Sequence, residues 1–275
     1  MSESPAVCVV IPVYKSTLTD YERISLTQCT RILGHYPLFV AAPMGLDVSE
    51  LVQEFPALQV KRFGPAFFAD VQAYNRLMLS ETFYRAFAGF EYLLIHQLDA
   101  FVFTDDLADW CRRGYDYVGA PWLRDIDFRS KTDELVFNAK KQAAIWLDLK
   151  KPDGITPREI IGQNSVGNGG LSLRRIPAFL TVLTSGVANQ KLATYTKNQT
   201  HQYNEDVFWG IEVNRYWPRL RVPDFRIALH FAVEFYPERA IKTYNQGQLP
   251  FGCHAWDIHE TDFWRTIFTC FGYNI

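Results

Sequence analysis

The residues best suited to chemistry fall in four short stretches that lie far apart in the sequence. They are Gln97-Leu98-Asp99, Gly167-Asn168-Gly169-Gly170, Glu205-Asp206, and His254 within the segment Gly-Cys-His-Ala-Trp. A carboxylate or a histidine can bind a divalent cation or move a proton, and closely spaced glycines let the backbone approach a ligand. Each stretch alone also fits an ordinary structural role, so a common purpose depends on the elements that carry them.

Asp99 comes near the end of the apolar segment 91–103, EYLLIHQLDAFVF. Such a run predicts a strand buried on both faces, and an unpaired charge inside it would be costly. We therefore expect Asp99 where the strand leaves the core, at the edge where open α/β sheets bind ligands. Its carboxylate could hold a divalent cation against a substrate diphosphate there. The structural alternative is an aspartate that caps the next turn.

The other three stretches also leave two interpretations open. Adjacent acids such as Glu205 and Asp206 often complement the dipole of a helix start, but one could be a general base beside an acceptor hydroxyl. A single histidine such as His254 is usually structural, but it could complete a metal site with Asp99. Gly169 and Gly170 belong either to an ordinary loop or to backbone that a ligand approaches closely.

The first half of the chain alternates predicted strands with predicted helices. Capping-box spacing from Thr19 to Glu22 predicts that the first helix starts there, and Gly34 would end it. Two more helices are expected at 70–88 and 104–113. This alternation predicts an α/β fold, a mostly parallel central sheet flanked by helices. The strands are expected at 6–14, 37–42, 58–63, 91–103 and 115–119.

The second half gives weaker signals. Residues 124–160 are predicted to be a long connection with a helix near 140–149. No repeat or linker interrupts the chain, so residues 1–275 are predicted to form a single domain. The remaining expected elements are a short strand after the glycine-rich loop, a helix between Pro177 and Gly186, a loop at 187–203, a helix at 204–217, a strand at 225–233, a turn-rich segment at 250–256 and a final helix.

Composition argues against several classes of protein. A net charge of −2 and a pI near 6.3 argue against binding nucleic acid by phosphate neutralisation, and against a polybasic membrane surface. Five cysteines without a CxxC pair favour reduced thiols in a cytoplasmic protein. We expect neither a signal peptide nor a transmembrane helix. Peripheral membrane association and the oligomeric state stay open.

The order of the four stretches resembles that of the GT-A glycosyltransferases over nearly the whole chain. In that superfamily a strand ends in an Asp-x-Asp motif whose last Asp binds a metal, and LLIHQLDAFVF is similar, with Asp99 in the last position. Residues 169–172 are similar to a Gly-Gly stretch of the β-1,3-galactosyltransferase and fringe-like families. Residues 205–210 match every fixed position of the Glu-Asp-Val-x-x-Gly motif of those families. The runs QLDAFVF, YDYVGAPW, NGGLSLR, EDVFW and PFGCHAW resemble a family of uncharacterised glycosyltransferase-like domains of bacteria and fungi.

The resemblance implies an inverting glycosyltransferase. It would move a sugar from a nucleotide-sugar donor to a hydroxyl of a glycan or lipid-linked glycan, in surface polysaccharide synthesis. Residues 1–123 would form the donor half, and 161–275 the acceptor and catalytic half. Asp206 would be the base, with Glu205 as its substitute, and Asp99 and His254 would hold Mn²⁺ or Mg²⁺. Donor contacts are expected from Pro12, Val13, Tyr14, Tyr74, Asn75, Gln97 and Asp99, and sugar contacts from Gly169, Gly170, Trp122, Trp209 and Trp256.

One departure supports an alternative interpretation. Gln97 stands where the superfamily has its first Asp, which often contacts the donor ribose, although the Gln amide could still bond a ribose hydroxyl. A catalytically degenerate domain that binds sugars or a partner enzyme is therefore one alternative, and the intact motif at 205–210 counts against it. A nucleotidyltransferase is a weaker alternative, because the segment Tyr14-Lys15-Ser16-Thr17 lacks the glycines of a phosphate loop.

Overall fold

A six-stranded sheet forms the centre of this computed structural model, which describes residues 6–198 and 200–275. The strand order is β3-β2-β1-β4-β7-β6. Neighbours from β3 to β4 are parallel, and β7 runs antiparallel to both β4 and β6. The prediction of a mostly parallel sheet is therefore confirmed. These strands are β1 (Val7–Pro12), β2 (Leu38–Pro43), β3 (Leu58–Phe63), β4 (Tyr92–His96), β6 (Tyr117–Gly119) and β7 (Leu171–Arg175).

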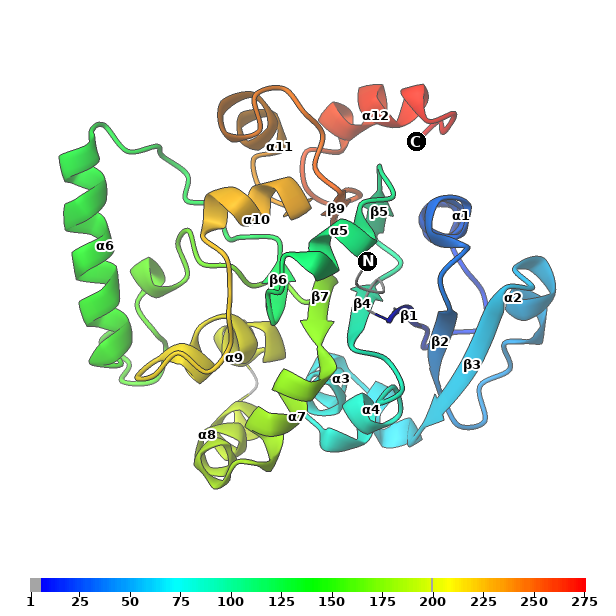
Figure 1. The fold of residues 1–275 in the computed structure, drawn as a ribbon, viewed down its shortest axis with the longest axis horizontal. Coiled ribbons are helices and arrows are strands. Elements are labelled where there is room, and N and C mark those ends of the chain that lie inside the picture. The colour runs from blue at the N-terminus through cyan, green and yellow to red at the C-terminus, as the bar shows by residue number, and fades with distance from the viewer. Residues whose placement is uncertain (1–5, 199) are drawn as a thin grey trace.

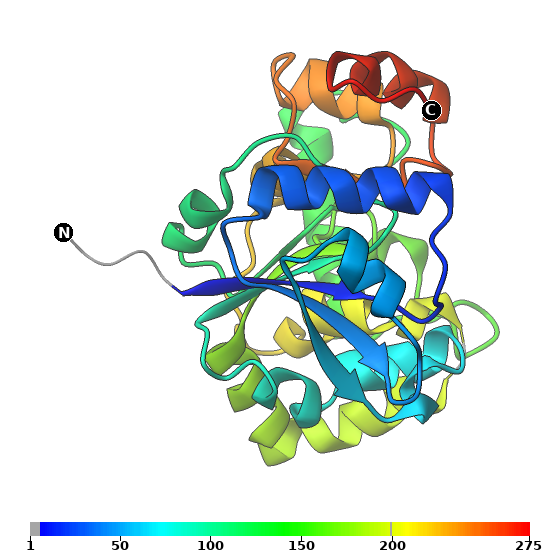
Figure 2. The same ribbon diagram turned by 90° about the vertical axis from the view of Figure 1, so that its right-hand side faces the viewer.

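Helices cover both faces of this sheet, as Figures 1 and 2 show. The first half contributes α1 (Asp20–Leu33), α2 (Ser49–Glu54), α3 (Val71–Met78), α4 (Glu81–Arg85), α5 (Leu107–Arg112) and α6 (Lys131–Trp146). The second half contributes α7 (Ile176–Thr184), α8 (Gly186–Lys197), α9 (Glu205–Gly210), α10 (Phe225–Phe231), α11 (Pro237–Arg239) and α12 (Thr261–Cys270). Short 3-10 or π turns lie at Pro65–Phe68, Glu159–Ile161, His201–Tyr203, Glu212–Asn214 and Ala240–Tyr244. None of the described helices is long and apolar enough to cross a bilayer.

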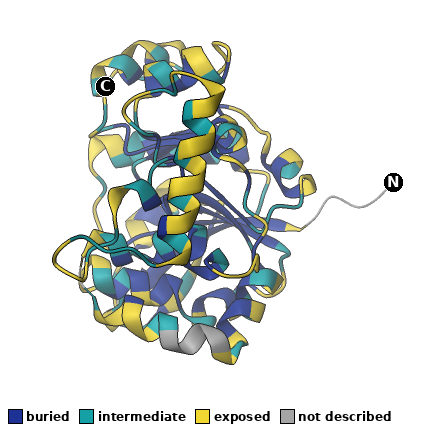
Figure 3. Ribbon diagram, turned by 90° about the vertical axis from the view of Figure 1, so that its left-hand side faces the viewer, coloured by how far each residue is buried: buried dark blue, intermediate teal, exposed yellow. Residues whose placement is uncertain are grey.

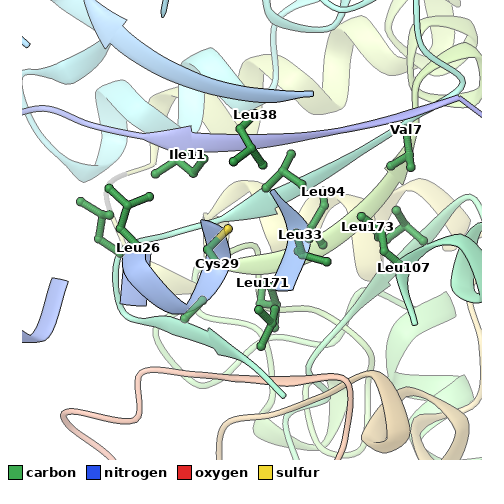
Figure 4. Packing of buried hydrophobic residues seen from close by; sticks show 14 of the residues in the cluster. Val7, Ile11, Leu26, Cys29, Leu33, Leu38, Leu94, Leu107, Leu171 and Leu173 are labelled. Atoms are coloured by element: carbon green, nitrogen blue, oxygen red, sulfur yellow. The ribbon is translucent and has the colours of Figure 1, made fainter. Parts of the chain in front are cut away.

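The alternation of side chains along each strand divides the core into two layers. Val7, Val9 and Ile11 of β1 point to one face and pack with α1, α2 and α5 (Figure 4). Cys8 and Val10 point to the other face and pack with α3, α4, α7 and α9. Because both faces are buried, the inner strands need apolar residues throughout, which is why they read as continuous apolar runs.

The strand order reverses at the middle of the sheet. From β1 the chain moves outward through β2 and β3, and then returns to place β4 on the other side of β1. A crevice opens at such a reversal, because the connections on its two sides lead away from each other. The carboxyl end of β4 is therefore the expected place for a ligand, and it is followed directly by Gln97.

A second, three-stranded sheet has the order β5-β9-β8, formed by β5 (Ala100–Val102), β8 (Ala232–Val233) and β9 (Gly252–His254) within the described residues. An aromatic cluster that includes Phe101, Trp256 and Trp264 supports it and joins it to α12. The outer edge of β5 is closed by α1, because Ser25 and Gln28 donate hydrogen bonds to the carbonyl oxygens of β5. This sheet brings the C-terminal third of the chain to the end of β4.

Several predicted elements differ in the structure, among them a helix expected at 204–217 that ends at Gly210. The strand expected at 91–103 is two strands, because a turn closed by the hydrogen bond from Ala100 N to Gln97 O redirects the chain. The helix expected at 70–88 is interrupted where Ser80 caps α4. The strand expected at 225–233 is mostly α10, which Asp224 caps. The loop expected at 187–203 contains most of α8. By contrast, the predicted capping box of α1 and its end at Gly34 are confirmed.

Candidate active site

A pocket of about 760 Å³ opens at the carboxyl end of β4, beside the start of β7. All four stretches singled out in the sequence contribute to its wall. These contributions are Gln97, Gly169 and Gly170, Glu205 and Asp206, and His254. The helix α3 and residues 122–125, 157–159, 161–163 and 234–236 are among the other parts of the chain that line it. Segments more than a hundred residues apart in sequence thus meet at the position that the topology favours.

Asp99 and His254 are brought together by the small sheet. Ala100 of β5 pairs with His254 of β9, so the residue before Ala100 lies next to the histidine. His254 Nε2 is 3.2 Å from Asp99 Oδ1 and 3.3 Å from Gln97 Oε1. Burial alone would raise the pKa of Asp99, but the His254 side chain outweighs it and holds that pKa below its usual value. The carboxylate is therefore ionised at neutral pH.

His254 lies between two carboxylates. Its Nδ1 atom is 3.6 Å from Glu234 Oε1, on the side of the ring opposite to Asp99. Burial lowers the pKa of the imidazole, but Asp99 and then Glu234 act in the opposite direction and raise it to about 10. The two carboxylates therefore favour a positive charge at His254, which a proton on the imidazole or a bound metal ion could supply.

Three donor atoms could bind a metal ion together. They are His254 Nε2, Asp99 Oδ1 and Gln97 Oε1, and both oxygens lie within 3.3 Å of the nitrogen. Adjacent ligands of an octahedral ion with bonds of about 2.1 Å are about 3 Å apart, so the spacing fits such an ion. A metal would have to replace the proton on His254. Residues 6–198 and 200–275 contain no cluster of three or more His, Cys, Asp or Glu side chains that could hold a metal, so this set depends on the Gln97 amide.

Glu205 is committed to a buried ion pair. Its two carboxylate oxygens accept hydrogen bonds from Arg174 at 2.7 and 3.1 Å, and both side chains are almost completely buried. Arg174 also donates to Tyr84 Oη and Ser172 Oγ at 3.0 Å each. With both oxygens held in this way, Glu205 positions the start of α9 and is unsuited to the substitute role of base.

Asp206 keeps the more available carboxylate of the two. It lines the pocket, is only partly exposed, and accepts a hydrogen bond from Val207 N at 2.7 Å through Oδ1. Burial, and after it the neighbouring Glu205 carboxylate, raises the pKa of Asp206 to about 7. Near neutral pH the group is thus divided between its acid and base forms, which suits proton transfer.

The glycine-rich stretch at 167–170 packs tightly against other side chains of the site. A Cβ atom on Gly169 would overlap Glu205 Oε1, and one on Gly170 would overlap the His254 ring. A Cβ atom on Gly167 would overlap the Trp122 ring. The side chains of the site itself therefore require glycine at these positions. Gly169 and Gly170 also line the pocket, so a sugar contact at their backbone stays a prediction.

The predicted donor contacts are only partly placed at the pocket. Pro12 and Val13 are buried in the core and do not line it, which corrects their assignment as donor contacts, and Tyr14 is 61% exposed outside it. Tyr74 and Asn75 of α3 do line the pocket. Asn75 accepts a hydrogen bond from Glu205 N at 3.3 Å and donates one to Asn204 Oδ1 at 2.9 Å, so its amide is used to hold α9.

The tryptophans divide between wall and core. Trp122 lines the pocket, where its ring packs over Gly167. Trp209 is fully buried against Phe179, and its indole N–H donates to Met78 O at 3.3 Å. Trp256 is also fully buried. The prediction that Trp209 and Trp256 stack on a sugar is therefore wrong, because neither ring has a free face.

Sequence reasoning missed Glu234. It follows β8, is 7% exposed, and its carboxylate accepts a hydrogen bond from Asn168 Nδ2. Asn168 has φ 49° and also accepts a hydrogen bond from Gly170 N at 3.0 Å. The pairing of β8 with β9 is what places this acid beside His254. A single acid in the run Ala-Val-Glu-Phe carries no spacing signal that could have identified it.

Comparisons with known proteins agree with this architecture. A model of the family described as "Protein of unknown function (DUF5672)" matches residues 57–254. The search of curated proteins gave no match.

Solved structures of glycosyltransferases resemble the fold. Mouse xyloside xylosyltransferase 1, in its apo form, shares 11% identity over 91% of this chain and 98% of its own, with a TM-score of 0.52. The galactosyltransferase LgtC, in complex with donor and acceptor sugar analogs, shares 12% identity over 90% of this chain and 86% of its own, with a TM-score of 0.50. The likeness shows a GT-A-like fold.

Proposed function

This chain belongs to the family described as "Protein of unknown function (DUF5672)", and we propose that it is an inverting glycosyltransferase that uses a nucleotide-sugar donor. One observation carries the proposal. A half-ionised carboxylate, Asp206, shares one pocket on a GT-A-like fold with the potential metal donors Gln97 and His254, and Asp99 lies against that histidine. An inverting transfer needs a base for the acceptor hydroxyl and a site for the donor diphosphate, and this pocket offers candidates for both.

Asp206 removes the proton from an acceptor hydroxyl in this proposal. The oxygen attacks the anomeric carbon of the donor sugar while the bond to the diphosphate breaks on the opposite side, so that carbon is inverted. The proton ends on Asp206 and the nucleoside diphosphate leaves. The pKa of about 7 lets the carboxylate accept a proton from one substrate and release it before the next at neutral pH.

The donor diphosphate would lie beside Gln97, Asp99 and His254. Mn²⁺ or Mg²⁺ bound there would neutralise the charge that develops on the leaving diphosphate. The chain's own contribution is to hold three donors at ligand spacing and to keep the ring of His254 fixed against Gly170. Trp122 offers a neighbouring ring for the sugar, and Tyr74 lines the same pocket.

Thermal melting with a panel of nucleoside diphosphates, with and without Mn²⁺, tests this function. A ligand that binds the folded state at a hundred times its Kd stabilises it by about 2.7 kcal/mol. We expect one diphosphate to raise the Tm in a Mn²⁺-dependent way, and His254→Ala to remove the dependence on Mn²⁺.

Hydrolysis of the matching nucleotide-sugar, followed by release of its diphosphate, then separates an enzyme from a sugar-binding module. Absence of any shift with every diphosphate would contradict the proposal. A shift without hydrolysis or transfer would favour the degenerate module, which the amide at Gln97 in place of a carboxylate supports.

A further inference from the structure

The chain exposes an aromatic patch at one end of the long helix α6. We define the aromatic patch as Trp146, Leu147, Tyr216 and Trp217, whose exposed fractions are 59%, 57%, 53% and 73%. Trp110, Trp209, Trp256 and Trp264 are almost fully buried. Two of the chain's seven tryptophans are thus exposed to solvent in one place. Exposed there, they add little burial of apolar surface to the stability of the fold, which is typical of an interaction site.

Arg215 holds the two halves of the aromatic patch together. Its guanidinium donates a hydrogen bond to Ile145 O and lies 3.1 Å from Asp148 Oδ1, which joins segment 215–217 to the end of α6. Arg215 is itself buried and also pairs with Glu212. The aromatic patch is therefore a fixed surface carried by two elements, and Figure 3 shows α6 lying along the outside of the molecule with largely exposed residues.

The charge around the aromatic patch is positive, although the whole chain has a net charge of −2. No Asp or Glu occurs at 213–223, the segment that carries Tyr216 and Trp217, and this segment contains Arg215, Arg219 and Arg221. Lys191 lies 5.9 Å from the centre of the Tyr216 ring. The acids Asp148 and Glu212 pair with Lys150, Lys191 and Arg215, so two negative charges meet three positive ones there. Arg219, two residues after Trp217, adds a further positive charge.

Exposed tryptophan and tyrosine beside cations are the combination that suits the interface of an anionic bilayer. The rings are amphipathic and lie at the level of the headgroups, and lysine and arginine attract the phosphates. We propose that the aromatic patch docks this protein on the surface of membranes that contain anionic phospholipid.

The position of the aromatic patch bears on the acceptor. Arg215, which holds the patch together, also lines the pocket, as do Tyr195 and Ile211. Docking would therefore bring one wall of the pocket close to the bilayer, within reach of a glycan carried on a lipid. This consequence rests on the proposed glycosyltransferase function, whereas the docking itself does not.

Co-sedimentation of the full chain with vesicles tests the docking, without donor, acceptor or metal. Vesicles of phosphatidylglycerol and phosphatidylcholine in equal parts should bind the chain, and phosphatidylcholine alone should bind it more weakly. High salt should reduce the binding, because it screens the charges. The double variant Trp146→Ala/Trp217→Ala should lower the partition by roughly tenfold, since interfacial binding scales with buried apolar area.

Ile258→Ala is the matched control, because Ile258 is 70% exposed and lies outside the aromatic patch. It should bind vesicles like the parent, and all variants should keep the parent Tm. Equal binding of parent and double variant, or no binding to the anionic vesicles, would overturn the proposal. A dimer in light scattering that the double variant loses would overturn it too, and would assign the patch to a second copy of the chain. Each of these results leaves the nucleotide-binding test of the proposed function untouched.

Discussion

At the scale of single residues, two adjacent acids have opposite fates. Glu205 is neutralised by Arg174, whereas Asp206 opens on the pocket with a pKa near 7. The difference arises because successive residues at the start of α9 point in different directions, one into the core and one into the pocket. Asp206 is therefore the proposed base, because its carboxylate is free of the ion pair that occupies both oxygens of Glu205.

The pH dependence of transfer should follow Asp206. Below pH 7 its carboxyl is protonated and cannot accept a proton, so kcat/KM should rise as the pH increases through about 7. Asp206→Asn should lower the rate by about 10²- to 10⁴-fold and remove this rise. Steady-state rates from pH 5 to 9, with a buffer-matched parent, would check it. A variant with near-normal turnover would exclude Asp206 as the base.

The same residue should make the folded state less stable at high pH. The ordinary pKa of an aspartate is 3.8, and that of Asp206 in the fold is about 7. The folded state therefore binds this proton more tightly than the unfolded state, and the resulting stabilisation is lost as the pH rises from about 4 through about 7. Asp206→Asn should therefore raise the stability at pH 8, by on the order of 2 kcal/mol once water in the pocket is allowed for. Urea unfolding at pH 8 and at pH 3.5 measures it, and an equal gain at both would contradict the assignment.

At the scale of elements, β7 and α9 are joined by charge. Arg174 of β7 is fully buried. Burial lowers the pKa of its guanidinium, but Glu205 and the other neighbours raise it by more, so Arg174 stays charged. Such a pair stabilises little by itself, but an unpaired member is costly. The pair therefore fixes where the start of α9 lies against the sheet, and with it the position of Asp206.

Breaking this pair should destabilise the fold strongly. Glu205→Gln leaves the buried Arg174 without its counter-charge, and we expect a loss of about 3–5 kcal/mol in the free energy of unfolding. Glu91→Gln is the matched control, because Glu91 pairs with the adjacent Arg175 at 3.0 Å but both side chains are well exposed. Its loss should stay below about 1 kcal/mol. Similar losses in both variants, measured by chemical denaturation, would show that burial does not set the cost.

The contact between Gly170, just before β7, and His254 of β9 should also be sensitive to substitution. A methyl group at Gly170 would overlap the His254 ring, so Gly170→Ala should displace that ring and abolish any Mn²⁺-dependent shift with nucleoside diphosphate. Gly89→Ala is the control, since its Cβ would meet no atom within 4 Å. Melting of both variants with and without ligand would check it. A preserved shift in Gly170→Ala would show that His254 is not a ligand.

At the scale of the whole molecule, the two sheets depend on each other. The middle strand of the small sheet, β9, supplies His254 to the site at the end of the large sheet. The aromatic residues of α12 cover Phe101 and Phe103 next to the turn that carries Asp99. The site therefore belongs to neither sheet alone.

Removal of residues 252–275 should accordingly abolish the cooperative fold. It would take away β9 and α12, leave β5 and β8 without a shared partner, and uncover the aromatic cluster. We expect the shortened chain to aggregate or to lose the single sharp unfolding transition of the full chain. Calorimetry and light scattering would measure this. A shortened chain with an unchanged transition would show that the large sheet folds independently.

Local patterns in the sequence were sufficient for much of the fold. Capping at Thr19, the apolar runs of the parallel strands and the end of α1 at Gly34 depend on neighbours in the chain, so the sequence alone predicted them. The division of 91–103 between two sheets was not predictable, because a partner strand some 150 residues later, β9, pairs with its second half.

The candidate site shows the same limit. Residue type and order were enough to predict Asp99, Asp206 and His254 as candidates, because carboxylates and imidazoles are uncommon in apolar surroundings. The resemblance already favoured Asp206 over Glu205 as the base, but only the tertiary structure supplied the physical reason, the Arg174 ion pair of Glu205, and added Glu234. The physical reason is that the ionisation and availability of a side chain depend on what it contacts across the fold, and such contacts leave no spacing in the sequence.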